Sequence, residues 1–385
     1  MANERRTQSV RRRTLSALFV GIALFTFPAP EAAAQSAAQG QQDTGFLNFF
    51  RKTEVAGTVD TYFHYNFNEP VTASLTPLRN FDFEHNQFSF ALAELALIKP
   101  AVADDRVGFR LDLDYGAVTD WVHSADPAGV EKIKHFQQAY ISYLAPVGSG
   151  LTFEVGKFVT QHGGEVIEAK DNWNYSRSLL FTVAIPYYHM GARVGYTPNN
   201  KLTLGGSVTN GWNNVTDNNS QKTYGLQAVI KPTPSLSIVQ NYMAGPEQTD
   251  NTDEWRHLVD TTVTYAVNDM FSVMGNYDYG SDGVGMETVT WQGLALYAKA
   301  QVNPYFAISP RWEYYNDEDA FTTGAAQNVK EFTLTGELKH SQGLIMRVEY
   351  RRDWSDIDFF TKDGTPRGDQ NTFSVGFVYA FSTKQ

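Results

Sequence analysis

Charged side chains two positions apart are the groups in this sequence that could do chemistry. They stand in two segments, RVEYRRD and RLDLD: Arg347, Glu349, Arg351, Asp353, Arg110, Asp112 and Asp114. In an extended chain, residues two apart share one face. Such a row of charges is costly in a dry core but suits a wall that faces water. Two such walls facing one another would create a transverse field across a constriction, which favours polar solutes that can orient.

The elements that carry these rows read as β-strands. The stretch YYHMGARVGYTPNNKLTLGGSVTNGW holds two runs of strict period-two alternation around a TPNN turn, which is the pattern of strands with one apolar and one polar face. Sixteen segments of this kind are predicted: 53–66, 86–99, 105–116, 134–144, 150–160, 186–197, 201–212, 221–231, 235–244, 254–267, 270–279, 287–302, 305–315, 327–340, 343–354 and 370–381. In 86–99 neither face is cleanly polar, because Glu94 shares a face with Phe88 and Phe90, and a bulge there would shift the register.

The connections between these segments alternate in length. Seven predicted turns have five residues or fewer, and eight predicted loops between them, such as 67–85, 161–185 and 280–286, have seven or more. Short turns at one end and long loops at the other are typical of bacterial outer-membrane barrels. The sequence therefore predicts an all-β fold, a transmembrane antiparallel up-and-down β-barrel of about sixteen strands over 53–385.

The N-terminus predicts export. Residues 1–34 combine arginines, the apolar segment LSALFVGIALFTF and a terminal AAA, as in a cleavable signal peptide with cleavage after Ala34. Residues 35–52 are expected to be a periplasmic segment before the barrel. No later apolar run approaches the roughly 18 residues of a membrane-spanning helix. The net charge of −11 argues against a nucleic-acid partner, and the absence of cysteine excludes disulfides.

In a barrel of this kind the apolar face meets lipid and the polar face lines a lumen, which sixteen strands make too wide for side chains to fill. We predict that eleven residues line the pore: Arg110, Asp112, Asp114, His189, Arg193, Arg311, Glu313, Arg347, Glu349, Arg351 and Asp353. For any one of them, simple pairing that stiffens the wall is an equal alternative. Eleven inward acids against eight bases indicate a weak preference for cations.

The longest predicted loop, 161–185, is expected to narrow the pore. It carries the apolar run LLFTVAI, which a surface loop would rarely expose, together with five charged residues: Glu165, Glu168, Lys170, Asp171 and Arg177. Folding into the lumen would bury the apolar run against the wall. Packing over the barrel mouth or against a neighbouring protomer is the alternative.

No pattern for catalysis or for a cofactor is present. The sequence lacks G-x-S-x-G, H-E-x-x-H and a phosphate-binding loop, and its eight histidines never fall at metal-ligand spacing. A dyad of Ser207 and His189 on neighbouring strands is far less expected than a chance pairing. We therefore expect neither an enzyme nor a metal or cofactor site, although a barrel hydrolase remains a minor alternative.

Four stretches between residues 136 and 214 resemble one family: FQQAYISYLAPVGSGLTFEVGKF, NYSRSLLF, PYYHMGARVGYTP and LGGSVTNGWNN. They are similar to the OmpL-like β-barrel porins of Gram-negative bacteria, and the barrel pattern extends this similarity from about residue 53 to the end. The resemblance implies an outer-membrane channel for small polar solutes or ions and no catalytic residues. Lipid, lipopolysaccharide and a homotrimer are the partners it makes plausible. A structural or adhesive barrel with an occluded lumen is the competing interpretation.

Overall fold

The computed structural model describes residues 48–70, 75–126 and 133–384, which belong to one compact unit starting at Asn48. The expected signal peptide at 1–34 and most of the segment 35–52 lie outside these residues. Within them, no helix has the length and apolar character needed to cross a membrane.

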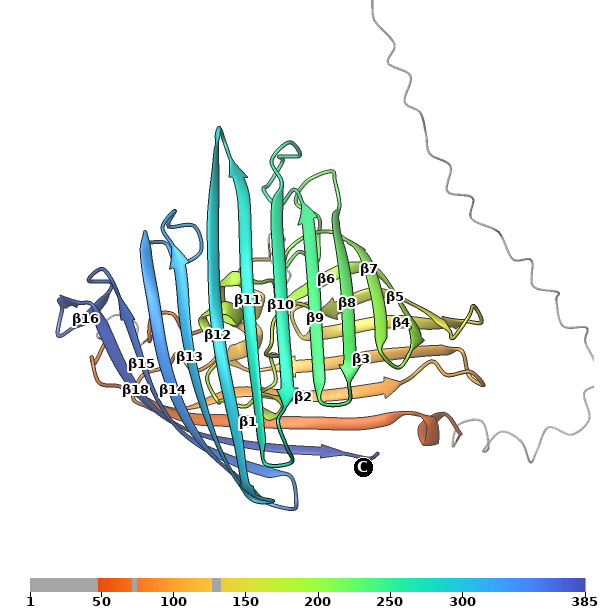
Figure 1. Ribbon diagram of the computed structural model, residues 1–385, viewed down its shortest axis with the longest axis horizontal. Helices are drawn as coiled ribbons and strands as arrows, with labels where there is room; N and C mark the ends of the chain where they lie inside the picture. The colour runs from red at the N-terminus through yellow and green to blue at the C-terminus, as the bar shows by residue number, and fades with distance from the viewer. Residues whose placement is uncertain (1–47, 71–74, 127–132, 385) are drawn as a thin grey trace, which may run out of the picture. The chain divides into compact units, whose positions relative to one another are not determined.

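Sixteen antiparallel strands close into a barrel, as the alternating pattern predicts, and β1 pairs with β18 to seal it (Figure 1). The first half comprises β1 (Glu54–Asn66), β2 (Gln87–Lys99), β3 (Val107–Tyr115), β4 (Phe136–Ala145), β5 (Leu151–Val159), β6 (Tyr188–Asn199), β7 (Leu202–Thr209) and β8 (Thr223–Thr233). The second half comprises β9 (Leu236–Gly245), β10 (Arg256–Ala266), β11 (Phe271–Val284), β12 (Glu287–Asn303), β13 (Phe306–Asp317), β14 (Gln327–Lys339), β15 (Leu344–Ser355) and β18 (Asp369–Ser382).

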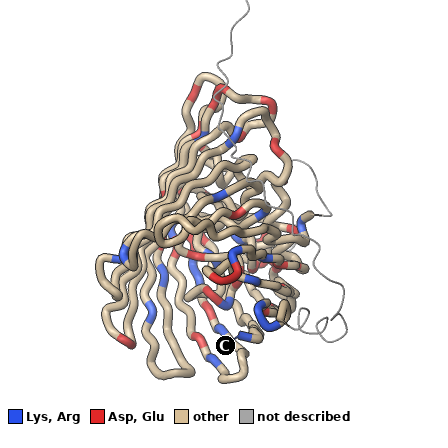
Figure 2. Tube along the Cα trace, turned by 90° about the vertical axis from the view of Figure 1, so that its right-hand side faces the viewer, with Lys and Arg blue, Asp and Glu red and all other residues tan. Residues whose placement is uncertain are grey.

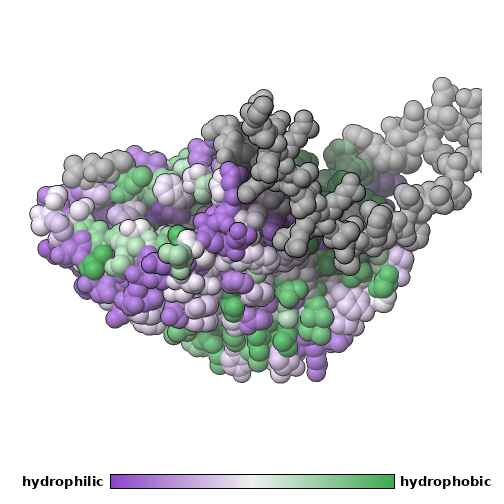
Figure 3. All heavy atoms as spheres, turned by 90° about the horizontal axis from the view of Figure 1, so that it is seen from above, coloured by the Kyte–Doolittle hydropathy of each residue, from purple (hydrophilic) through white to green (hydrophobic). Residues whose placement is uncertain are grey.

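The strand faces divide as the period-two pattern requires. On β18, Phe373, Phe377 and Tyr379 are exposed on the outside, whereas the alternate residues Thr372 and Ser374 are buried on the inside. Apolar residues gather on the outer surface along the lower edge of Figure 3. Basic and acidic positions are interspersed along the chain rather than segregated (Figure 2). The outside is therefore suited to lipid and the inside to charge pairing.

A β-bulge explains the ambiguous second strand. The pairing of β1 with β2 matches Asp60 with Leu92 but Thr61 with Phe90, so Ala91 is an extra residue in β2. Before the bulge Phe88 and Phe90 point outward and are exposed, and after it Glu94 lies on the inner face and is buried. The bulge predicted from the mixed face of this segment is confirmed.

Three connections differ from the expected loops. Strand β11 continues to Val284, so the predicted loop 280–286 is instead the end of a long hairpin that turns at Gly285, where φ is +66°. This hairpin rises above its neighbours in Figure 1. The loop after β3 contains a short helix, α2 (Ala117–Val122), and the loop after β15 contains a small hairpin, β16 (Phe360–Lys362) and β17 (Thr365–Arg367).

Candidate functional site

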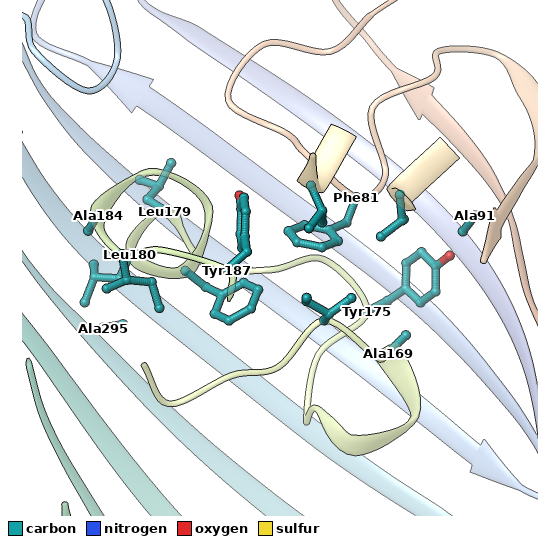
Figure 4. Packing of buried hydrophobic residues seen from close by; sticks show 14 of the residues in the cluster. Phe81, Ala91, Ala169, Tyr175, Leu179, Leu180, Ala184, Tyr187 and Ala295 are labelled. Atoms are coloured by element: carbon teal, nitrogen blue, oxygen red, sulfur yellow. The ribbon is translucent and has the colours of Figure 1, made fainter. Parts of the chain in front are cut away.

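The connection between β5 and β6, residues 160–187, enters the barrel and crosses its lumen; we call it L3. It is built from irregular chain with two short helical turns, Ala169–Asp171 and Leu180–Ala184. Its apolar residues form a buried cluster with inward side chains of the wall and with residues 75–86 of the loop between β1 and β2. In Figure 4, Tyr187 lies beside Phe81 and Leu180 lies beside Ala295 of β12. The inward folding predicted from LLFTVAI is thus observed, and it has the expected cause: apolar burial.

Charged side chains of β15 hold the backbone of L3. Arg347 donates hydrogen bonds to the backbone carbonyls of Ala169 and Asn172, and the bond to Asn172 is 2.5 Å long. Glu349 accepts hydrogen bonds from the backbone N–H groups of Tyr175, at 2.7 Å, and Ser176, at 3.0 Å. A loop without regular structure leaves many backbone groups unpaired, and these two side chains satisfy several of them.

Strand β13 holds L3 on either side of the segment that β15 binds. Arg311 forms ion pairs with Glu165 of L3 and with Glu331 of β14, each at 2.9 Å. Glu313 accepts from the backbone N–H of Leu179 at 3.0 Å. Positive and negative side chains of the wall therefore both hold the loop. The arginines bind its backbone carbonyls, and the glutamates bind its backbone amides.

The predicted pore-lining residues on β13 and β15, which we call the charge ladder, face the lumen but are covered. Each of its members on β13 and β15 is 2% exposed or less: Arg311, Glu313, Arg347, Glu349, Arg351 and Asp353. Arg351 donates to the carbonyl of Arg177 in L3, at 2.7 Å, and forms a 2.6 Å ion pair with Asp353. These residues are placed to position L3, and the loop separates them from the open part of the lumen.

The wall formed by β5 to β8 is different, and glycines show the contrast. A Cβ atom added to the inward Gly195 of β6 would meet nothing within 4 Å, whereas one at Gly376 of β18 would lie 2.3 Å from the ring of Tyr175. One at Gly293 of β12 would lie 2.7 Å from Leu180. L3 therefore packs against the β12 and β18 side and leaves space along β6.

Two cavities lie on the side of the barrel formed by β3 to β8. One, of about 340 Å³, lies between L3 and the wall, and its lining includes Arg110, Glu168 and Asp171. The other, of about 180 Å³, is lined partly by Glu154 and Arg193, which form an ion pair across β5 and β6. The side chains of Arg110, Glu154 and Arg193 are 32%, 19% and 17% exposed, so their charges remain accessible to water.

The remaining predicted site residues serve other contacts. Arg177 donates to carbonyls within L3, including that of Tyr175 at 2.6 Å, and braces the loop. Lys170 pairs with its neighbour Asp171. Asp112 is buried in a 2.8 Å ion pair with Arg110. His189 is also buried, with Nδ1 3.0 Å from the carbonyl oxygen of Gly211.

Residues 75–86 of the loop between β1 and β2 also fold inward, which the sequence pattern did not predict. Its Arg79 pairs with Asp82 at 3.1 Å and donates to Thr372 of β18 at 2.7 Å. Burial lowers the pKa of Arg79 from its ordinary value. The signal available was the same as in L3, since FDF at 81–83 sets aromatic residues beside charge in a loop.

A serine and a histidine do meet in the lumen, at a different place from the pair considered above. Nδ1 of His64 lies 2.8 Å from Oγ of Ser374, and Asp82 approaches the same nitrogen at 3.7 Å. A proton relay needs the acid and the serine on opposite ring nitrogens. Both His64 and Ser374 are also buried, so this contact supports the packing of residues 75–86 and offers no site for a substrate.

A closed antiparallel barrel with an apolar belt, a polar inside and an inward third loop defines the outer-membrane porins. Within that class, the chain belongs to the family described as "Putative beta-barrel porin-2, OmpL-like", whose model matches residues 52–381.

Solved structures agree with this fold. The outer membrane channel DcaP of Acinetobacter baumannii is 13% identical, and the match covers 86% of this chain and 97% of that chain with a TM-score of 0.57. An anion-selective porin from Comamonas acidovorans is 11% identical, covering 86% and 99% with a TM-score of 0.57. A trimer form of OmpT from Vibrio cholerae is 11% identical, covering 86% and 99% with a TM-score of 0.55. None of the curated proteins matches the chain in sequence.

Proposed function

We propose that small polar solutes and ions diffuse through this porin along the wall formed by β3 to β8, beside L3 rather than through the centre of the barrel. The observation that carries this proposal is the empty space at Gly195, compared with the close packing at Gly376. The two cavities lined by Arg110 and Arg193 lie on the same side. Water attracted by the charged side chains that line the two cavities would join them into a continuous aqueous path.

Of the predicted pore-lining residues, Arg110 and Arg193 then face the solute directly, while the ladder on β13 and β15 acts through L3. In the same way, Glu168 and Asp171 present the charge of the loop to the path. The opposite charges of a buried ion pair nearly cancel at a distance, so the paired residues exert little field on a solute. The selectivity of the channel would therefore depend on the few accessible charged groups.

The test is conductance in a planar bilayer with a KCl gradient. The channel should show discrete open steps, and Gly195→Trp should lower their size by at least half, because the indole would occupy the open space. Ser237→Trp on β9, a matched change on the inner wall, is expected to have a smaller effect. A folded barrel without any current would contradict the proposal.

The competing function is a structural or adhesive barrel with an occluded lumen. The buried apolar cluster of L3 favours it, since this cluster fills much of the β12 and β18 side. Absence of current, together with intact heat-modifiable migration on gels, would move that function to first place.

Export, localisation and assembly belong to the same proposal. A cleavable signal peptide at residues 1–34 would deliver the chain through the inner membrane to the outer membrane. The apolar belt would contact lipid and lipopolysaccharide, and the trimer form of a structurally similar protein supports a homotrimer.

A further inference from the structure

Three carboxyl groups meet where L3 passes the strands β2 and β3. Glu94 of β2 and Asp114 of β3 are direct cross-strand partners, and both face the lumen. The side chain of Glu168 in L3 lies within hydrogen-bonding reach of Glu94. We call these three residues the acidic recess.

Oxygen atoms of the recess lack partners within the part of the chain that the structure describes. Both carboxylate oxygens of Asp114 and the Oε2 atom of Glu94 accept no hydrogen bond there, although the two residues are only 1% and 8% exposed. Buried polar atoms without partners are rare and costly in proteins. A donor from outside the chain would remove this cost.

The nearby cationic side chains are already engaged. Arg110 binds Asp112 with its Nε atom at 2.8 Å, and Lys170 pairs with Asp171. The Nζ atom of Lys157 lies 2.5 Å from Nε2 of His123 and 4.3 Å from the centre of the Tyr188 ring. Lys157 and Arg110 also act electrostatically on Asp114, but neither donates a hydrogen bond to Asp114 or to Oε2 of Glu94. Among the described residues, the recess therefore keeps carboxyl oxygens that no base binds directly.

Of the three recess residues, Glu168 lines a neighbouring cavity, and this cavity indicates the kind of cation. It has a volume of about 340 Å³, and its lining joins Glu168 to the apolar side chains of Val166 and Ile167. No group of three or more acidic, cysteine or histidine residues among the described residues is arranged to hold a metal ion. An ammonium or guanidinium group is larger than a metal ion, and it brings several N–H donors to separated oxygens.

We propose that the acidic recess binds solutes that carry an ammonium or guanidinium group next to a short apolar part. Their N–H groups reach the oxygens of Glu94, Asp114 and Glu168, and their carbon atoms pack against Val166 and Ile167. The inference rests on the diffusion path proposed above, since it names the class of solute that this path retains.

The test uses n-butylammonium chloride as the probe on the purified channel in a planar bilayer. In symmetrical KCl it should reduce the single-channel current in a saturable way, and sodium butyrate at equal concentration should not. Glu168→Gln and Asp114→Asn should each raise the half-blocking concentration at least about threefold, the change expected for one unit charge roughly 6 Å away in water. Asp363→Asn is the matched control, because this exposed acid lies in a hairpin turn and tolerates asparagine at its φ of +51°.

Two results would overturn the inference: equal block by butyrate and butylammonium, or unchanged block in both recess variants. Failure of the channel proposal would look different, because KCl itself would then carry no current. In that case calorimetric titration of n-butylammonium into the detergent-solubilised protein decides, with the same variants and control. Binding that weakens in Glu168→Gln supports the recess, and absence of binding removes it.

Discussion

Arg311 of β13 and Glu165 of L3 form an ion pair with nitrogen and oxygen 2.9 Å apart, and both side chains are buried. This contact joins the wall to a loop that lies 146 positions away in the chain. Together with the contacts of Arg347 and Glu349, it makes the path of L3 part of the barrel. The predictions that follow test how the wall, the loop and the open space depend on one another.

Loss of one wall arginine should release the loop. In Arg347→Gln, the carbonyls of Ala169 and Asn172 lose their donor and Glu337 loses a 2.6 Å ion-pair partner. Removing one partner of a buried pair costs about 3 kcal/mol. We expect larger and noisier single-channel currents and a lower midpoint of thermal unfolding.

The control for this change is Arg352→Gln on the same strand. Arg352 points outward, its side chain is 51% exposed, and its partner Asp369 lies at the surface. Equal effects of the two variants would show that charge loss on β15, and not release of L3, is responsible.

Access of water should differ between two inward threonines. The chain contains no cysteine, so Thr203→Cys and Thr335→Cys each introduce a unique thiol. Thr203 lines the cavity beside Arg193, whereas Thr335 is 0% exposed and lies 2.7 Å from Asn174 of L3. A charged methanethiosulfonate reagent should modify the first and reduce its conductance, and it should leave the second unmodified. The opposite order would place the path on the wrong side of L3.

Adding one methyl group at Gly376 of β18 should disturb the packing of L3 against this strand. In Gly376→Ala the new Cβ would lie 2.3 Å from the ring of Tyr175, whose hydroxyl donates to Asp60 at 2.9 Å. Overpacking of this kind costs about 2 kcal/mol. The unfolding midpoint should fall, whereas Gly195→Ala should leave it unchanged because the same methyl would enter open space. Similar midpoints for both variants would contradict the asymmetry of the lumen.

The stability of the loop that follows β9 should depend on pH through Glu247. Burial raises the pKa of this carboxyl to about 7, and it accepts hydrogen bonds from Trp212 N–H at 2.6 Å and from Thr223 at 2.5 Å. A raised carboxyl pKa means that the folded loop binds more protons than the unfolded one between the ordinary value of 4.5 and about 7. The contribution of Glu247 to the stability of the folded loop is therefore fully present below about pH 4.5 and declines as the pH rises through about 7.

The measurement for Glu247 is hydrogen exchange of residues 210–222 and 246–255 as a function of pH. Exchange should become faster between about pH 4.5 and pH 7 by more than the intrinsic rate, because the buried carboxyl loses its proton in that window. Glu247→Gln should remove this extra dependence, and Glu254→Gln in the same loop should keep it. An unchanged profile in Glu247→Gln would exclude this carboxyl as the cause.

The strands could be predicted because their pattern is local. All sixteen barrel strands overlap the predicted segments, and even the bulge at Ala91 was visible in the mixed face around Glu94. The inward direction of L3 could be predicted as well, because LLFTVAI is too apolar for a surface loop.

The position of L3 within the lumen could not be predicted. Which charges stay in water depends on where the loop docks, and that follows from contacts such as Tyr175 with Asp60 and Leu180 with Ala295, over long distances in sequence. The period-two pattern places Arg193 and Arg347 on the same kind of face, yet one is accessible and the other is covered. The inward folding of residues 75–86 and the extended hairpin of β11 and β12 likewise depend on packing that no local pattern records.

The wall side chains hold L3 mainly through its main chain. Arg347 and Glu349 bind carbonyls and amides that every residue type supplies, so side chains of L3 other than Glu165 and those of its buried cluster can change while the loop keeps its place. Glu168 points into the cavity from such a loop. Evolution could therefore change which solutes the constriction prefers by single substitutions in L3, without rebuilding the barrel that supports it.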